Sequence, residues 1–220
     1  MDLNSFLTTF SIAAIPVIFA ITVHEVAHGW VAKLFGDRTA QMQGRLSLNP
    51  IRHIDPVGTI LVPAVLLALG GFMFGWAKPV PVDPRNLRDP RPNMAVVSFA
   101  GPAANFAMAI LWAFVMVIAR DFNLGAASEW LFLMGAYGIT FNIAIGLLNL
   151  IPIPPLDGGQ LLQNLLPLGP LTNLLDRIRP FGFLIILVMI PTGILSFLLA
   201  GPMSFLHDVI QAIFGVRGLG

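Results

Sequence analysis

The chain has no cysteine and few charged residues. Without cysteine, disulfides and thiolate metal ligands are excluded, so any metal ion has to be held by His, Asp or Glu. Charged residues make up only 10% of the 220 residues, against about a quarter in ordinary soluble domains. No long basic run is present, so nucleic acid is not an expected partner.

Apolar residues are abundant instead. They make up 56% of the chain, and the mean hydropathy is +0.83, which is typical of an integral protein of the lipid bilayer. Because a helical span needs roughly 20 mostly apolar residues, the chain has room for about five membrane segments. We therefore predict an all-α polytopic membrane protein that forms one membrane-embedded domain over residues 1–220, with small β elements near its cytoplasmic face.

The apolar runs place the expected segments along the chain. The core of the domain is predicted over residues 5–165, with an accessory C-terminal segment over 180–216. The apolar start lacks a basic region in front of it and continues directly into a polar motif, so it is expected to be retained instead of being cleaved as a signal peptide. Spans are expected at residues 5–35, 93–119, 130–150 and 181–200, a further membrane segment at 57–76, and an interfacial helix at 206–216.

Segment 57–76 contains Pro63 and the pair Gly70-Gly71, and both of its flanks are basic. The positive-inside rule places both flanks in the cytoplasm, so either the segment re-enters or it spans with one basic loop on the disfavoured side. Re-entry is favoured. Short extended elements are expected beside it, a strand at 45–48 and an edge or polyproline-like segment at 76–82.

The most informative motif is His24-Glu25-Val-Ala-His28, which lies in the first apolar helix. Residues i and i+4 share one helical face, so the two imidazoles can bind one metal ion. A glutamate beside such a pair is positioned to take a proton from a zinc-bound water. The pattern therefore predicts one Zn²⁺ per chain, bound by His24 and His28, with Glu25 as the catalytic acid and base.

A catalytic zinc usually has three protein ligands, and Asp157 is the strongest candidate for the third. It ends an apolar span, precedes Gly158-Gly159, and is expected on the same membrane side as His28. Carboxylates in membranes are costly unless they are paired or bind a metal. The expected reaction is hydrolysis of a peptide bond.

These motifs resemble those of the site-2 protease family of intramembrane zinc metalloproteases. The family has HExxH in one membrane helix and N-x-x-P-x-x-P-L-D-G-G in a later one, which match residues 24–28 and 149–159. A third family-like element, G-P-x-x-N, matches residues 101–105. The chain looks like a minimal form of the family, since no stretch is long or polar enough for a PDZ or cystathionine-synthase-type domain.

The resemblance implies zinc on His24, His28 and Asp157, and Asn149 as a donor near the transition-state oxyanion. Asn105 either takes part in the site, orients a neighbouring loop or packs helices. The implied substrate is a transmembrane protein or peptide that unwinds and lies along an edge segment near the zinc, and 43–48 or 76–82 could be that edge. The implied location is a prokaryotic cell membrane, with the active site towards the cytoplasmic side.

Two alternatives stay open. His53, in Arg-His-Ile-Asp-Pro, is either a further site residue or an ordinary surface histidine beside Asp55. As a whole, the chain is either the protease described above or a non-proteolytic membrane protein, such as a transporter or scaffold, that retains a metal site. A purely structural metal site would not need Glu25 beside the histidine pair.

Overall fold

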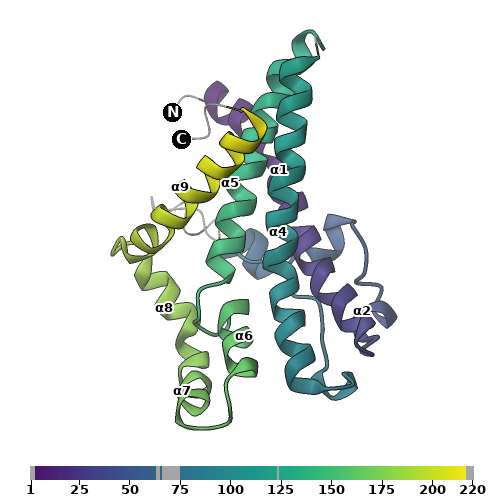
Figure 1. The fold of residues 1–220 in the computed structure, drawn as a ribbon, viewed down its shortest axis with the longest axis vertical. Helices are drawn as coiled ribbons and strands as arrows, with labels where there is room; N and C mark the ends of the chain where they lie inside the picture. Colours follow the sequence, from purple (N-terminus) through teal and green to yellow (C-terminus); the bar gives the residue numbers. More distant parts are fainter. Residues whose placement is uncertain (1–2, 63–64, 66–74, 123, 217–220) are drawn as a thin grey trace.

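A computed structural model of the chain describes residues 3–62, 65, 75–122 and 124–216. Four long helices dominate this part of the chain, α1 (Leu3–Leu34), α4 (Pro90–Asp121), α5 (Ala126–Asn149) and α9 (Ile194–Phe214) (Figure 1). The shorter elements are α2 (Thr39–Met42), η1 (Pro50–His53), η2 (Pro56–Leu61), η3 (Pro84–Asn86), α6 (Asp157–Leu165), α7 (Pro170–Ile178), η4 (Arg179–Phe181) and α8 (Gly182–Met189). The predicted all-α class is confirmed.

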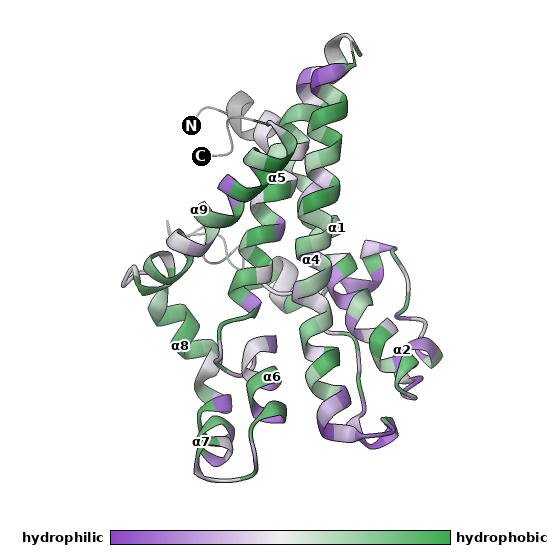
Figure 2. Ribbon diagram, viewed as in Figure 1, coloured by the Kyte–Doolittle hydropathy of each residue, from purple (hydrophilic) through white to green (hydrophobic). Residues whose placement is uncertain are grey.

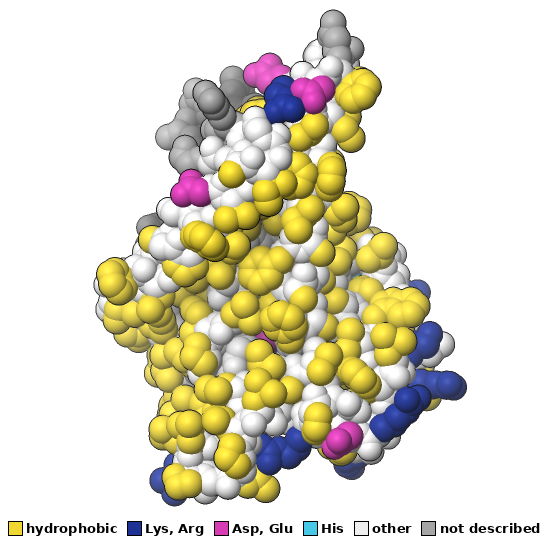
Figure 3. All heavy atoms as spheres, viewed as in Figure 1, with side chains coloured by type: hydrophobic (Ala, Val, Ile, Leu, Met, Phe, Trp, Pro, Cys, Tyr) yellow, Lys and Arg dark blue, Asp and Glu magenta, His cyan; other side chains and the backbone are white. Residues whose placement is uncertain are grey.

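The four long helices are each long and apolar enough to cross a membrane. Apolar residues colour most of their length in Figure 2. In Figure 3 hydrophobic side chains cover the middle of the visible face, while lysine and arginine gather mainly at its lower end and a smaller charged group lies at the upper end. This distribution is that of an integral membrane protein, whose apolar belt faces lipid and whose charged ends face water.

Helix α4 is the centre of the packing, because it contacts α1, α5, α6 and α9. The main core cluster joins small and medium side chains of α4 and α5 to the end of α9, namely Ala109, Ala113, Met116, Ile139, Ile143, Ile210 and Val216. Small residues let membrane helices approach closely, so that van der Waals contact holds them together where lipid provides no hydrophobic driving force. Helix α1, which carries His24 and His28, packs against both α4 and α5, so these three helices together position the motif.

The span predicted at 181–200 is wrong in its boundaries. Helix α8 ends at Met189, and the chain turns at Pro191 and Gly193 before α9 begins at Ile194. Proline cannot continue the hydrogen-bond ladder of a helix, and Gly193 has φ +76°, a left-handed conformation that glycine adopts at little cost. The last helix that could span is therefore 194–214, which absorbs the segment predicted as interfacial.

The small β elements are not present among the described residues. Residues 75–83 are extended, but Pro79 and Pro81 lack the amide donors that a strand ladder needs. Residues 45–49 are likewise unpaired by any strand in the part of the chain that the structure covers. The choice between re-entry and spanning for 57–76 falls largely on residues outside the described ranges.

Candidate metal centre

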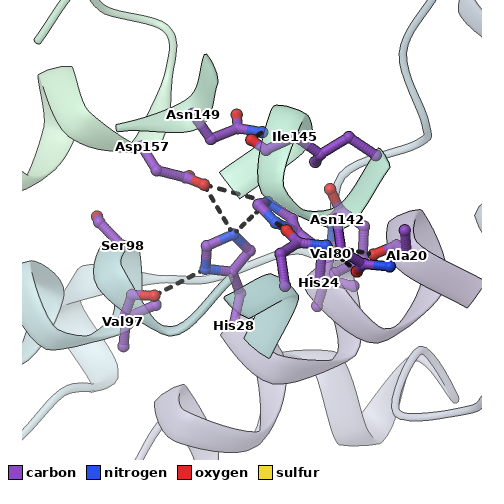
Figure 4. A network of polar contacts seen from close by, with 12 residues as sticks. Ala20, His24, His28, Val80, Val97, Ser98, Asn142, Ile145, Asn149 and Asp157 are labelled. Atoms are coloured by element: carbon purple, nitrogen blue, oxygen red, sulfur yellow. Dashed lines mark hydrogen bonds and ion pairs between the residues drawn. The ribbon is translucent and has the colours of Figure 1, made fainter. Parts of the chain in front are cut away.

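Three side chains from two distant parts of the sequence meet at one point between α1 and α6 (Figure 4). His24 Nε2 and His28 Nε2 lie 3.1 Å apart. Asp157 Oδ2 lies 3.1 Å from the first of these atoms and 3.3 Å from the second. The structure thus brings together the three residues that the sequence predicts as zinc ligands.

Helix α1 presents the histidine pair because it continues through the polar motif without a break. It ends at Leu34, shortly after His28, and just beyond this end Gly36 has φ +112° and the amide of Asp37 donates to the carbonyl of Ala32. This is a Schellman-type end of a helix, which satisfies a terminal carbonyl. Helix α1 thus ends at a glycine that can adopt the required positive φ. The His24 side chain within it is 6% exposed.

Asp157 is the first residue of α6, the short helix that follows the proline-rich turn 150–156. A carboxylate is favoured in the first turn of a helix because the free amide groups there carry partial positive charge. Gly158 allows the turn to fold against this helix, since a Cβ at that position would collide with the backbone of Leu150 and Ile151. The turn and the glycine together aim Asp157 at the histidines.

Helix α4 leaves room beside the histidine pair at Gly101. A Cβ at this position would lie within 3.0 Å of Nε2 of both His24 and His28. Any side chain there would occupy the space in front of the imidazole nitrogens. Gly101 therefore opens the face of α4 on which the metal-binding atoms converge.

The donor set fits a metal ion. His28 Nδ1 lies 2.7 Å from the carbonyl of Val97, which can only accept, so Nδ1 carries the proton and Nε2 of the neutral ring offers a lone pair. Asp157 Oδ2 is buried and has no hydrogen-bond partner among the described residues. A tetrahedral ion with bonds of about 2.0–2.1 Å has ligand atoms about 3.3 Å apart, which matches the observed separations of 3.1 to 3.3 Å.

Glu25 lies beside this group and is held by the extended segment on the opposite wall. The backbone amide of Val80 donates to Glu25 Oε2 at 2.7 Å. Both residues line a cavity of about 300 Å³ that also exposes the two histidines and Asp157. The cavity is large enough for water and a short stretch of backbone, so the group has room for a reactant.

The remaining predicted residues are placed differently from one another. Asn149 lines the cavity, and its Nδ2 donates to the carbonyl of Ile145 at 3.0 Å, which leaves one amide hydrogen without an acceptor among the described residues. Asn105 lies behind the site, with Oδ1 2.6 Å from Nδ1 of His24. His53 does not line the cavity; it is only 3% exposed, not a surface residue, and its Nε2 donates to the carbonyl of Ser47.

Three groups that shape the site were not among the predicted site residues. Asn142 pairs with Asn105, the Val80 amide holds Glu25, and Gly101 provides clearance. For Asn142 a signal existed, because an amide inside an apolar span needs a partner. A backbone amide such as that of Val80 has no residue signature, and the position of Gly101 against α1 follows only from the packing of the helices.

Comparisons with known proteins identify the family of the chain. The family model of Peptidase family M50 matches residues 12–127 and 117–190. "Putative zinc metalloprotease YwhC" of Bacillus subtilis (strain 168) is 38% identical over 203 residues, which cover 91% of this chain and 89% of that protein. "Putative zinc metalloprotease Rip2" of Mycolicibacterium smegmatis is 31% identical over 199 residues, 87% of this chain and 71% of that protein.

A more distant relative is "Putative zinc metalloprotease MJ0611" of Methanocaldococcus jannaschii, 26% identical over 163 residues, 73% of each chain. No solved structure matches the chain. The matched relatives are named zinc metalloproteases, and the apolar helices and the His-His-Asp group of this chain fit that class of protein. More narrowly, the chain belongs to peptidase family M50, which confirms the resemblance to the site-2 proteases.

Proposed function

We propose that this protein is an intramembrane zinc metalloprotease that hydrolyses peptide bonds in or near transmembrane segments of other membrane proteins. One observation carries the proposal: the His24, His28 and Asp157 ligand atoms converge beside Glu25 in a cavity framed by helices long and apolar enough to cross a membrane. A soluble peptidase would have no need to place its catalytic group there.

In this proposal His24, His28 and Asp157 hold the ion, which supplies the positive charge that polarises a peptide carbonyl and acidifies water. Glu25 accepts a proton as the water oxygen bonds to the carbonyl carbon. It then delivers the proton to the amide nitrogen as the C–N bond breaks. The Val80 amide orients the Glu25 carboxylate for both transfers.

Asn149 is the proposed donor to the oxyanion. It lies at the end of α5 and lines the cavity, and its amide retains one hydrogen that the helix does not use. A donor aimed at the developing negative charge is worth several kcal/mol in other enzymes, about 2.7–4 for a single side-chain amide. The substrate segment has to be unwound here, because a helical peptide bond is shielded by its own turn.

The proposed setting is a prokaryotic cell membrane, with one membrane-embedded domain in the whole chain and the cavity open to the cytoplasm. Most lysines and arginines follow the His24–His28 motif closely in the sequence or lie in the short helices after Asp157, including Lys33 in the last turn of α1 and Arg38 and Arg45 beyond it, and Figure 3 shows most of the visible ones at one end of the molecule. By the positive-inside rule this end faces the cytoplasm. Water would then reach the site from that side.

The test compares cleavage of a single-span membrane substrate by wild type and by Glu25→Gln, in liposomes, with zinc measured in both. General acid and base groups contribute about 10²–10⁴-fold to rates, so a loss of that size with zinc content unchanged is expected. The matched control is Glu129→Gln, which makes the same change at the other glutamate of the chain, an exposed residue. Wild-type cleavage by a zinc-loaded Glu25→Gln would refute the mechanism.

A further inference from the structure

Two completely buried amides lie behind the metal-binding group, Asn105 on α4 and Asn142 on α5. Asn105 Nδ2 lies 3.0 Å from Asn142 Oδ1 and 3.1 Å from the carbonyl of Ala20 on α1. Asn142 Nδ2 lies 2.8 Å from the carbonyl of Gly138, one turn back in its own helix. The amides thus form a chain that crosses three helices and ends at Nδ1 of His24, 2.6 Å from Asn105 Oδ1.

The direction of this chain is fixed by its two backbone carbonyls. The carbonyl of Gly138 can only accept, so the NH₂ group of Asn142 has to face it, and the Asn142 oxygen has to face Asn105. Asn105 must then turn its NH₂ group towards that oxygen and towards the carbonyl of Ala20. Only its own oxygen is left for His24. In this arrangement, and in no other, each side-chain nitrogen and oxygen of Asn105 and Asn142 has a hydrogen-bond partner.

The orientation of Asn105 determines which nitrogen of His24 carries the proton. Because Asn105 presents an oxygen, His24 Nδ1 must carry the proton, and Nε2 of the neutral ring has a lone pair that points at His28 and Asp157. His28 obtains the same tautomer directly from the carbonyl of Val97. For His24 the equivalent acceptor is a side chain that could rotate by half a turn, and it is held by two acceptors of its NH₂ group, the carbonyl of Ala20 and the side-chain oxygen of Asn142.

We infer that Asn142 is a positioning residue of the metal centre: acting through Asn105, it fixes the tautomer and ring orientation of His24. The inference rests on the proposed zinc site. Outer partners of metal-binding histidines set ring orientation and basicity, and their loss typically lowers metal affinity about 10–100-fold. Asn142 does not touch the ligand group, so its effect is transmitted by hydrogen bonds alone.

Three substitutions separate this role from simple packing. Asn142→Leu keeps the approximate volume but leaves a hydrogen of Asn105 without an acceptor. Asn142→Asp conserves the shape, and as a neutral carboxyl group it can donate to Gly138 and accept from Asn105. Thr140→Val is the control, because Thr140 lies two residues away on α5 and makes a separate contact between helices, 3.4 Å to His207.

The measurements are the zinc dissociation constant from chelator competition and the visible spectrum of the Co²⁺-substituted protein, in detergent, without reference to cleavage. We expect Asn142→Leu to weaken zinc binding at least about 10-fold and to change the Co²⁺ spectrum. Asn142→Asp should restore both, and Thr140→Val should match wild type. Thermal unfolding of the metal-free proteins reports whether each variant is folded.

If Asn142→Leu does not fold, Asn142→Ser decides. Its hydroxyl can still bond the carbonyl of Gly138, as serine does within helices, but it is too short to reach Asn105, so the same loss of affinity is expected. Wild-type zinc affinity and an unchanged Co²⁺ spectrum in the folded variant, Asn142→Leu or Asn142→Ser, would overturn the inference. An equal loss of zinc affinity in Thr140→Val would overturn it too. Absence of zinc binding by wild type would instead refute the proposed function.

Discussion

The two walls of the cavity are built in different ways. The metal-binding wall consists of helices, and its two histidines are fixed by buried groups of α4, the Asn105 side chain for His24 and the Val97 carbonyl for His28. The opposite wall is the extended segment 75–83, which is attached through its backbone. Its amides donate from Val80 to Glu25, from Asp83 to Asp37, and from Lys78 and Trp76 to the carbonyls of His53 and Gly58, while the carbonyls of Lys78 and Trp76 accept from Arg45 and Thr59. We infer that metal affinity depends on the first wall and that turnover depends additionally on the second.

The largest effect is expected from Asp157→Asn, which removes the only carboxylate of the ligand group. The amide that replaces it is a neutral and weaker ligand, so zinc affinity should fall by more than the roughly 10–100-fold typical of outer partners. Zinc content after dialysis against a chelator measures it. Asp176→Asn, at an exposed residue of α7, is the control. Full zinc content in Asp157→Asn would remove this residue from the ligand set.

The next largest effect is expected at Gly101, which leaves space beside the two histidines on the helical wall. Gly101→Ala places a methyl group within 3.0 Å of Nε2 of both histidines, so the imidazoles have to move away from the added methyl group. We expect zinc affinity to fall about 10-fold or more, as for other changes that misplace a ligand. Gly201→Ala on α9 is the matched control, because no atom lies within 4 Å of the Cβ it would add. Equal affinity of both variants would contradict the role of Gly101.

The extended wall is tested by Val80→Pro, which removes the amide that donates to Glu25. Hydrogen bonds to charged groups contribute about 1.5–3 kcal/mol, so kcat should fall about 10- to 100-fold while zinc content stays at the wild-type level. Val82→Pro is the control, because the Val82 amide makes no hydrogen bond within the described residues. Loss of zinc in Val80→Pro would show that the two walls are not independent.

The contrast between the helical wall and the extended wall also explains which parts of the fold and of the site could be predicted from the sequence. The ligand group was predictable because i and i+4 spacing on a helix is a local property, and because Asp157 is a carboxylate at the end of an apolar run. The boundary of the last span was not, since Pro191 and Gly193 divide an apolar stretch whose average hydropathy hides the break.

The contacts of the extended wall could not be predicted at all. Two of them join backbone amides to carboxylates across 46 and 55 positions of sequence, and a backbone amide carries no residue-specific signal. Asn142 lies between these extremes. Its position in an apolar helix indicates that its amide needs a hydrogen-bond partner inside the protein. Only the packing of α5 on α4 shows that this partner is Asn105.

The smallest expected effect concerns the attachment of the extended wall to the end of α1 at Asp37. This carboxylate is completely buried and accepts hydrogen bonds from Thr39, from Asn86 and from the amide of Asp83. Burial by itself raises the pKa of Asp37, but the hydrogen bonds from Thr39, Asp83 and Asn86 together outweigh it, and the pKa lies below its ordinary value.

A carboxylate whose pKa is lowered by folding stabilises the folded state fully above its unfolded pKa, about 3.9, and this contribution is lost as the pH falls through the lower folded value. Hydrogen exchange of the Asp83 amide, corrected for intrinsic rates, should therefore show constant protection from neutral pH down to about 4 and a loss below it. Asp37→Asn should lower the protection and remove its pH dependence, whereas Asp55→Asn, which alters a carboxylate at the start of η2, should leave both unchanged. Protection of Asp83 that persists unchanged in acid would mean that Asp37 does not tether this wall, and its attachment would then have to be sought at Lys78 and Val80.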